Sequence, residues 1–139
     1  MNFLDTNLFV YTFDDRDERK RRRARGLVAD ALHTGDGIIS YQVVQEFFNV
    51  ATRKFTTPLR AEDCGRYLDR VLTPLCEIFP SIPLYRAALD IHERWQLSYY
   101  DALIAASALQ GGCDLLYTED LHHGLKIQSL TVTNPFLAD

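Results

Sequence analysis

The stretch MNFLDTN (residues 1–7) opens the chain as a short apolar run that ends in a carboxylate and then turns polar. It predicts a buried strand that carries Asp5 at its C-terminal end. In an open α/β sheet, ligands bind in the crevice outside the C-terminal ends of the parallel strands, so Asp5 is the first candidate site residue. A structural role competes with this reading, because Asp5 or Asn7 can also cap the helix that begins near Leu8. The positions of the other carboxylates decide between the two.

Length and composition indicate one domain that spans residues 1–139. A chain of 139 residues with 47% hydrophobic and 12% aromatic residues can bury one sizeable core but has no room for two. The net charge of -4 argues against a protein that grips nucleic acid by bulk charge alone.

The cysteines and the apolar runs bear on the cellular setting. Cys64, Cys76 and Cys113 are odd in number and lack a C-x-x-C spacing, which argues against a disulfide framework and a zinc knuckle. The N-terminus lacks the basic and apolar regions of a signal peptide, and no apolar run approaches the roughly 20 residues that span a bilayer. We therefore expect a cytoplasmic protein with no membrane contact.

Predicted strands and helices alternate along the chain. A β-branched run at 37–40 and short, mostly apolar runs at 75–79 and 114–117 follow the first strand, and the tail offers a fifth strand within 125–133. The helical period runs through 18–33, 41–51, 60–72, 84–95 and 97–109. This alternation is typical of a parallel sheet covered by helices on both faces. The sequence thus predicts an α/β fold, a three-layer α/β/α sandwich with a mainly parallel central sheet of about five strands.

Three further carboxylates, at different kinds of position, are candidates beside Asp5. Glu46 lies about a turn and a half into the helix after the second strand and can reach back over the sheet edge, although an isolated helical Glu is usually a surface residue. Asp101 lies in the first turn of an alanine-rich helix, where the helix dipole alone favours a carboxylate. Asp120 follows the fourth strand as Asp5 follows the first.

These four acidic residues can converge on one rim of the sheet. Neighbouring carboxylates raise one another's pKa, and a fold that keeps such a cluster usually neutralises it with a cation. Oxygen ligands without cysteine or paired histidine favour Mg²⁺, with Mn²⁺ as the alternative ion.

The chain resembles PIN domains of the kind found in VapC-type ribonuclease toxins of toxin–antitoxin pairs. The resemblance runs through nearly the whole sequence, from LDTN (4–7) through Glu46, YDALIAA (100–106) and LYTEDL (116–121) to NPF (134–136). Each motif is weak by itself, but their order and spacing together are specific.

The resemblance implies a Mg²⁺-dependent endoribonuclease in which a metal-activated water hydrolyses RNA phosphodiester bonds. Its catalytic residues and metal ligands are the same four, Asp5, Glu46, Asp101 and Asp120. Thr118 and Asn7 would support them, and the Thr-x-Asp pattern selects Asp120 over Glu119 as the metal ligand. RNA as substrate, a cognate antitoxin protein and a homodimer are further implications.

Other functions remain open at this stage. A PIN-type RNA-processing nuclease outside any toxin system fits the same residues. A dehalogenase-like phosphatase also places Asp after its first strand, but its second Asp is replaced here by Asn7. A non-catalytic PIN-like module is disfavoured by the intact acidic set. For the basic run at 20–25, a solvated helix face is preferred to a phosphate-binding surface.

Overall fold

The structure is a computed structural model that describes residues 1–137. Its centre is a six-stranded sheet in the order β3-β2-β1-β4-β6-β5, in which every neighbouring pair is parallel except β5 and β6. The strands are β1 (Asn2–Leu4), β2 (Gly37–Ser40), β3 (Cys76–Ile78), β4 (Leu115–Tyr117), β5 (Lys126–Ile127) and β6 (Leu130–Thr133). The predicted mainly parallel sheet is confirmed. It has one more strand than expected, because the tail folds back on itself as the hairpin β5–β6.

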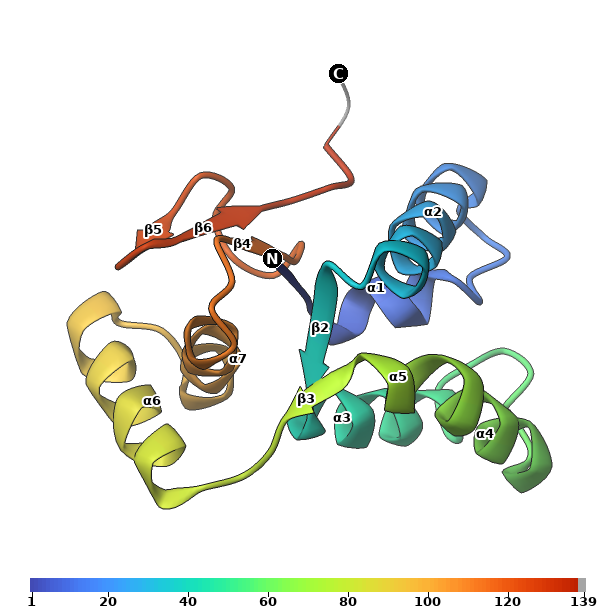
Figure 1. Ribbon diagram of the computed structural model, residues 1–139. Helices are drawn as coiled ribbons and strands as arrows, with labels where there is room; N and C mark the ends of the chain where they lie inside the picture. Colours follow the sequence, from blue (N-terminus) through green and yellow to red (C-terminus); the bar gives the residue numbers. More distant parts are fainter. Residues whose placement is uncertain (138–139) are drawn as a thin grey trace.

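Helices cover both faces of the sheet and complete the predicted three layers. In Figure 1, α6 and α7 lie on one side of the strands, and α1 and α2 lie on the other. The helices are α1 (Thr6–Tyr11), α2 (Glu18–Thr34), α3 (Tyr41–Ala51), α4 (Ala61–Tyr67), α5 (Thr73–Leu75), α6 (Ile82–Trp95) and α7 (Tyr99–Gln110), with a π-helical turn η1 (Leu68–Leu72) between α4 and α5.

The segment expected as one helix over 60–72 is less regular than its pattern predicts. The α-helical hydrogen bonding changes to the π turn at Leu68, and the helical path then continues past Pro74 to Leu75. Pro74 lies within this helical path and does not end it at Leu72, although its ring removes one backbone donor.

The strand β1 lies at the centre of the sheet and sets the position of the first carboxylate. Phe3 is fully buried and pairs with Ile38 of β2 on one side and Leu116 of β4 on the other. The backbone N–H of Asp5 then donates to the carbonyl of Tyr117 at 3.0 Å. The residue after β1 and the loop after β4 are therefore held side by side at one edge of the sheet.

The cysteines Cys64, Cys76 and Cys113 are free thiols. Within residues 1–137, no helix combines the length and the apolar character that a bilayer crossing requires.

Candidate active site

Asp5 directly follows β1 and is the N-cap of α1. One carboxylate oxygen, Oδ1, accepts a hydrogen bond from the Thr6 backbone N–H at 2.7 Å, and Oδ2 accepts one from the Thr118 hydroxyl at 2.8 Å. Its side chain is buried, with 6% exposure. The cap role and the site role, which the sequence left as alternatives, are thus compatible, since each uses a different oxygen.

Thr118 joins the two chain segments that carry Asp5 and Asp120. Its buried hydroxyl donates to Asp5 and accepts from the Asn7 side-chain amide and from the Asp120 backbone N–H, both at 3.1 Å. The Asn7 amide also donates to Oδ2 of Asp120 at 3.1 Å. A hydroxyl has one donor and two acceptor positions, and all three are used here. Asn7 and Thr118 therefore fix the relative placement of the two aspartates.

Glu46 and Asp101 reach the same region from α3 and α7. The next residue along α3, Phe47, is fully buried, so Glu46 stands at the border of the buried face of the helix. Asp101 lies in the first turn of α7, where its backbone N–H donates to the Ser98 hydroxyl at 3.2 Å. Gln42, one turn before Glu46, donates from its amide nitrogen to the Tyr100 carbonyl at 3.2 Å and so ties α3 to the start of α7.

The carboxylates share one electrostatic field. Burial, and then the charges of Asp120 and Glu46, raise the pKa of Asp5 to about 7, against the lowering effect of its hydrogen bonds. Desolvation is also the largest cause that raises the pKa of Glu46, followed by the charges of Asp101 and Asp120. The pKa of Asp120 is raised by desolvation and by the charges of Asp101 and Glu119, while Asn7 lowers it.

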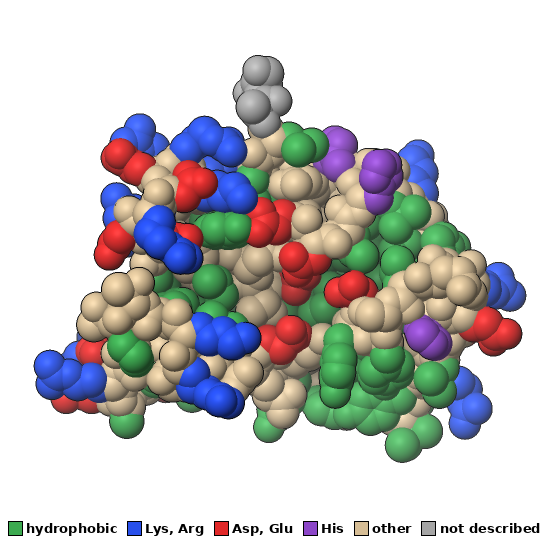
Figure 2. All heavy atoms as spheres, turned by 180° about the vertical axis from the view of Figure 1, so that it is seen from behind, with side chains coloured by type: hydrophobic (Ala, Val, Ile, Leu, Met, Phe, Trp, Pro, Cys, Tyr) green, Lys and Arg blue, Asp and Glu red, His purple; other side chains and the backbone are tan. Residues whose placement is uncertain are grey.

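Each of the four predicted carboxylates is therefore close enough to at least two others for their charges to interact. Figure 2 shows acidic side chains across a hollow in the middle of one face, with Lys and Arg side chains on one flank and hydrophobic ones on the other. Asp5 is buried, whereas Glu46 and Asp120 remain open to solvent. The site is therefore a cluster of carboxylates that is buried at Asp5 and open to solvent at Glu46 and Asp120.

The donor chemistry of this cluster fits a hard divalent cation. Its carboxylates repel one another, and Oδ1 of Asn7 is a buried oxygen with no hydrogen-bond partner among the described residues. Oxygen atoms of this kind are the ligands that Mg²⁺ and Mn²⁺ prefer. Within residues 1–137, no three His, Cys, Asp or Glu side chains are gathered closely enough to form a ready metal cage.

The carboxylate of Glu119 has different hydrogen-bond partners from that of Asp120. Its carboxylate accepts from Lys20 Nζ at 2.9 Å and from the Tyr11 hydroxyl. Lys20 also lies over the Tyr11 ring, 4.7 Å from its centre. Glu119 is thus neutralised by a cation of α2, whereas Asp120 is held by Asn7.

The basic run at 20–25 is largely engaged within the chain. Lys20 pairs with Glu119, and Arg21 and Arg22 form ion pairs with Asp15 and Glu18. Arg23 and Arg25 instead donate to backbone carbonyls, those of Pro135 and Thr12. Arg22, Arg23 and Arg25 nevertheless remain exposed, so the expectation of a solvated helix face stays a prediction.

Sequence reasoning missed two contributors to this region. Gln42 could have been found from its place one helical turn before Glu46. The pairing of Lys20 with Glu119 joins residues far apart in the chain, and the sequence pattern carries no signal for it.

Comparisons with known proteins identify the fold independently. The PIN domain family model matches residues 3–124. No curated protein is matched by the sequence. A toxin–antitoxin complex from Klebsiella pneumoniae is similar in structure, with 20% identity over 97% of this chain and 98% of that chain and a TM-score of 0.69.

Two further solved structures have the same fold. VapC20 from Mycobacterium tuberculosis, described as a sarcin-ricin loop cleaving toxin, is 18% identical over 86% of this chain and 90% of that chain, with a TM-score of 0.65. VapBC2 from Rickettsia felis, bound to a promoter DNA fragment, is 17% identical over 96% and 97%, with a TM-score of 0.66. The family-model match spans most of the chain and confirms the resemblance read from its motifs: the chain belongs to the PIN domain family.

Proposed function

We propose that this chain is a Mg²⁺-dependent endoribonuclease and the toxin of a toxin–antitoxin pair. The observation that carries the proposal is the convergence of four carboxylates, from the end of β1, from α3, from α7 and from the loop after β4, in one electrostatic field of a PIN domain. An acidic cluster of this kind repels an RNA phosphate unless a cation is bound, so nuclease activity and metal binding are expected together.

Asp5, Glu46, Asp101 and Asp120 would hold the metal, with Mn²⁺ as an alternative to Mg²⁺. When bound, the ion lowers the pKa of a coordinated water and offsets the charge that develops on the scissile phosphate. Asp101 or Asp120 would orient the attacking water and accept its proton. Asn7 holds Oδ2 of Asp120, which leaves Oδ1 for that contact.

A phosphatase that uses Asp5 as nucleophile is a weaker candidate. Such a carboxylate must reach the substrate phosphorus, but Asp5 is 6% exposed and both of its oxygens accept hydrogen bonds. The position that carries a second aspartate in that family is Asn7, whose amide is occupied by Thr118 and Asp120.

The antitoxin part of the proposal is supported by the relatives of this fold, which include toxin–antitoxin complexes. The acidic hollow should attract an Arg or Lys side chain of an antitoxin, since charge-assisted hydrogen bonds to carboxylates are among the strong ones. Such a side chain would compete with the metal. Binding of the antitoxin should therefore lower both RNA cleavage and Mg²⁺ affinity.

We also propose a homodimer. The outer face of α6 exposes Ile82 and Leu89, seven residues apart and thus on one side of the helix, with exposures of 69% and 55%. Large exposed apolar side chains in a row are typical of a protein interface. Sedimentation of the wild type and of a variant with both residues changed to serine tests this: the wild type should be dimeric and the variant monomeric.

The decisive test of the enzyme is cleavage of a mixed RNA substrate by the purified protein in Mg²⁺, in Mn²⁺ and in excess EDTA. Cleavage should require the metal and should be abolished by Asp101→Asn. Asp90→Asn is the matched control, because Asp90 is an exposed helical aspartate paired with Arg94 outside the cluster. Cleavage that persists undiminished in EDTA, or in the Asp101 variant, would rule out the proposed mechanism.

A further inference from the structure

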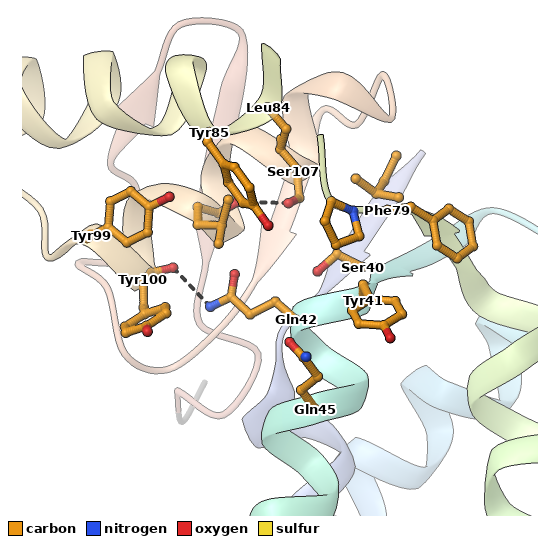
Figure 3. Close-up of a pocket in the computed structure, with 13 residues that line it drawn as sticks. Ser40, Tyr41, Gln42, Gln45, Phe79, Leu84, Tyr85, Tyr99, Tyr100 and Ser107 are labelled. Atoms are coloured by element: carbon orange, nitrogen blue, oxygen red, sulfur yellow. Dashed lines mark hydrogen bonds between the residues drawn. The ribbon is translucent and has the colours of Figure 1, made fainter. Parts of the chain in front are cut away.

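A cavity of about 260 Å³ opens beside the acidic cluster, between the start of α3, the loop after β3, the first turn of α6 and the part of α7 from Tyr99 to Ser107. Figure 3 shows the side chains that line it. Ligand pockets for drug-sized molecules measure about 300–1,000 Å³, so this one suits a single heterocycle. None of the described residues that line it is charged.

Two buried polar groups of the cavity lack a partner. The hydroxyl of Ser40 and Oε1 of Gln42 form no hydrogen bond within the described chain, although their side chains are only 2% and 9% exposed. The amide nitrogen of Gln42 donates to the Tyr100 carbonyl, which can only accept, and this contact fixes the orientation of the amide. In Figure 3, its oxygen is turned towards Tyr85 and the cavity.

Native proteins rarely leave buried polar atoms without partners, and those that exist call for an explanation. A ligand with an N–H group would satisfy Oε1 of Gln42. The Ser40 hydroxyl can donate to or accept from the same ligand.

Aromatic side chains form the walls of the cavity. Tyr41, Phe79, Tyr85 and Tyr100 all line it and keep 44%, 56%, 36% and 67% of their surface exposed. Exposed aromatic rings that surround one cavity offer stacking surfaces for a flat ligand. Nucleobases are flat, uncharged and rich in N–H donors, and single-stranded RNA is recognised by stacking on such rings.

The cavity and the acidic cluster are connected by adjacent residues of the same helices. Gln45 precedes Glu46, and Tyr100 precedes Asp101. Gln42 lines the cavity and also faces the Glu46 carboxylate, whose pKa it lowers. A base in the cavity would therefore place its own sugar and phosphate close to the carboxylates.

We propose that this cavity binds one unpaired nucleobase of the RNA, next to the bond that is cleaved. The inference rests on the proposed ribonuclease function and adds a recognition subsite to it. The base stacks on the tyrosine rings, donates an N–H to Oε1 of Gln42 and hydrogen-bonds the Ser40 hydroxyl. Because these contacts use the edges that a duplex conceals, the subsite selects single-stranded or looped RNA.

The first arm of the test needs no cleavage. The full chain in EDTA is mixed with adenosine, cytidine, guanosine or uridine, and saturation-transfer NMR measures contact with the base protons; ribose is the control ligand without a base. Base protons of at least one nucleoside should be saturated, and ribose should not. Tyr100→Ser and Gln42→Leu should lose the signal, whereas Leu32→Ser, an exposed apolar residue of α2, should keep it.

The second arm measures kcat/KM on a single-stranded RNA in which abasic sugars replace one nucleotide at a time around the cleaved bond. One position should lower kcat/KM of the wild type by about 5- to 150-fold, the range expected for loss of one stacked base. That penalty should disappear in Tyr100→Ser and persist in Leu32→Ser. Tyr100 is 67% exposed, so its replacement leaves the core intact.

The two arms separate the failure of this proposal from the failure of the nuclease. If no RNA is cleaved but nucleosides bind and the variants abolish binding, the ribonuclease function fails and the base site stands. If RNA is cleaved without an abasic penalty, or with one that survives in Tyr100→Ser, the subsite is overturned. It is also overturned if no nucleoside binds to an inactive protein, or if self-association at higher concentration removes the nucleoside signal because a second copy covers the cavity.

Discussion

Replacing Asp5 by asparagine should stabilise the metal-free protein in alkaline solution and destabilise it in acid. Burial, and then the charges of Asp120 and Glu46, raise the pKa of Asp5 from 3.8 to about 7. A carboxyl whose pKa is higher in the folded state contributes stability that is fully present below its unfolded pKa and is lost as the pH rises through the folded pKa. For Asp5, the loss therefore falls between about pH 4 and pH 7.

The size of the effect follows from two opposing changes. The rise in pKa corresponds to about 4 kcal/mol of unfolding free energy that the wild type loses above pH 7. The variant does not lose it, because asparagine does not ionise. Asparagine still accepts from the Thr6 N–H, but its amide nitrogen would meet a Thr118 hydroxyl whose two acceptor positions are already occupied. That loss costs about 1–3 kcal/mol at every pH. The variant should thus gain about 1–3 kcal/mol at pH 8 and lose a similar amount at pH 4.

Thermal melts of both proteins in EDTA across this pH range measure the difference, at about 4 °C per kcal/mol for a chain of this size. Asp90→Asn, on the exposed side of α6, should follow the wild type at every pH. At pH 8, added Mg²⁺ should raise the wild-type midpoint and leave the Asp5 variant unchanged, because only the wild type has the full ligand set. A variant that melts below the wild type at pH 8 in EDTA, together with a wild type indifferent to Mg²⁺, would refute the reasoning and return Asp5 to a purely capping role.

Three further perturbations test separate parts of the structure. Thr118→Val removes the shared hydroxyl and should lower the unfolding free energy by about 1–3 kcal/mol in urea titrations, whereas Thr118→Ser should remain close to the wild type; equal stability of the valine variant would contradict the hydrogen-bond assignment. Lys20→Met leaves Glu119 without its cation and should lower the unfolding free energy by about 1 kcal/mol. Adding Glu119→Gln should restore most of that loss. Additive effects of the two substitutions would argue against coupling between the residues. Gly37→Ala should cost about 1–3 kcal/mol, because its Cβ would lie 2.5 Å from that of Ala31, while Gly26→Ala, with nothing within 4 Å, should stabilise α2 by about 0.5–1 kcal/mol. Calorimetric midpoints that move together in the two glycine variants would show that the close contact is relieved at no cost.

The positions of Asp5 and Asp120 could be predicted because a parallel sheet brings the C-terminal ends of its strands to one edge. Both follow short apolar runs, and β1 and β4 are indeed neighbours, with Leu4 paired to Tyr117. Glu46 could be placed only approximately, since a helical position gives a direction but no distance. The order of the strands, by contrast, depends on which runs pair across long stretches of chain, and local sequence does not encode this.

The irregular parts were harder to predict for physical reasons. The π turn at Leu68 leaves the apolar spacing of its helix almost unchanged, so periodicity does not reveal it. The hairpin β5–β6 has strands of two and four residues, and its turn places Gln128 at a φ of 56°, a conformation more typical of glycine or asparagine. Turn chemistry at that point gave no signal for a sixth strand.

All hydrogen-bonding positions of the Thr118 hydroxyl are used, and this restricts which substitutions the protein can accept during evolution. Because one donor and two acceptors at position 118 serve three partners in two chain segments, a change at position 7 or position 120 alters what position 118 must supply. Single substitutions in this trio would be removed by selection more often than paired ones. Among natural relatives, positions 7, 118 and 120 should therefore vary together, and any lineage that has lost the hydroxyl should also have rebuilt the contacts of its neighbours.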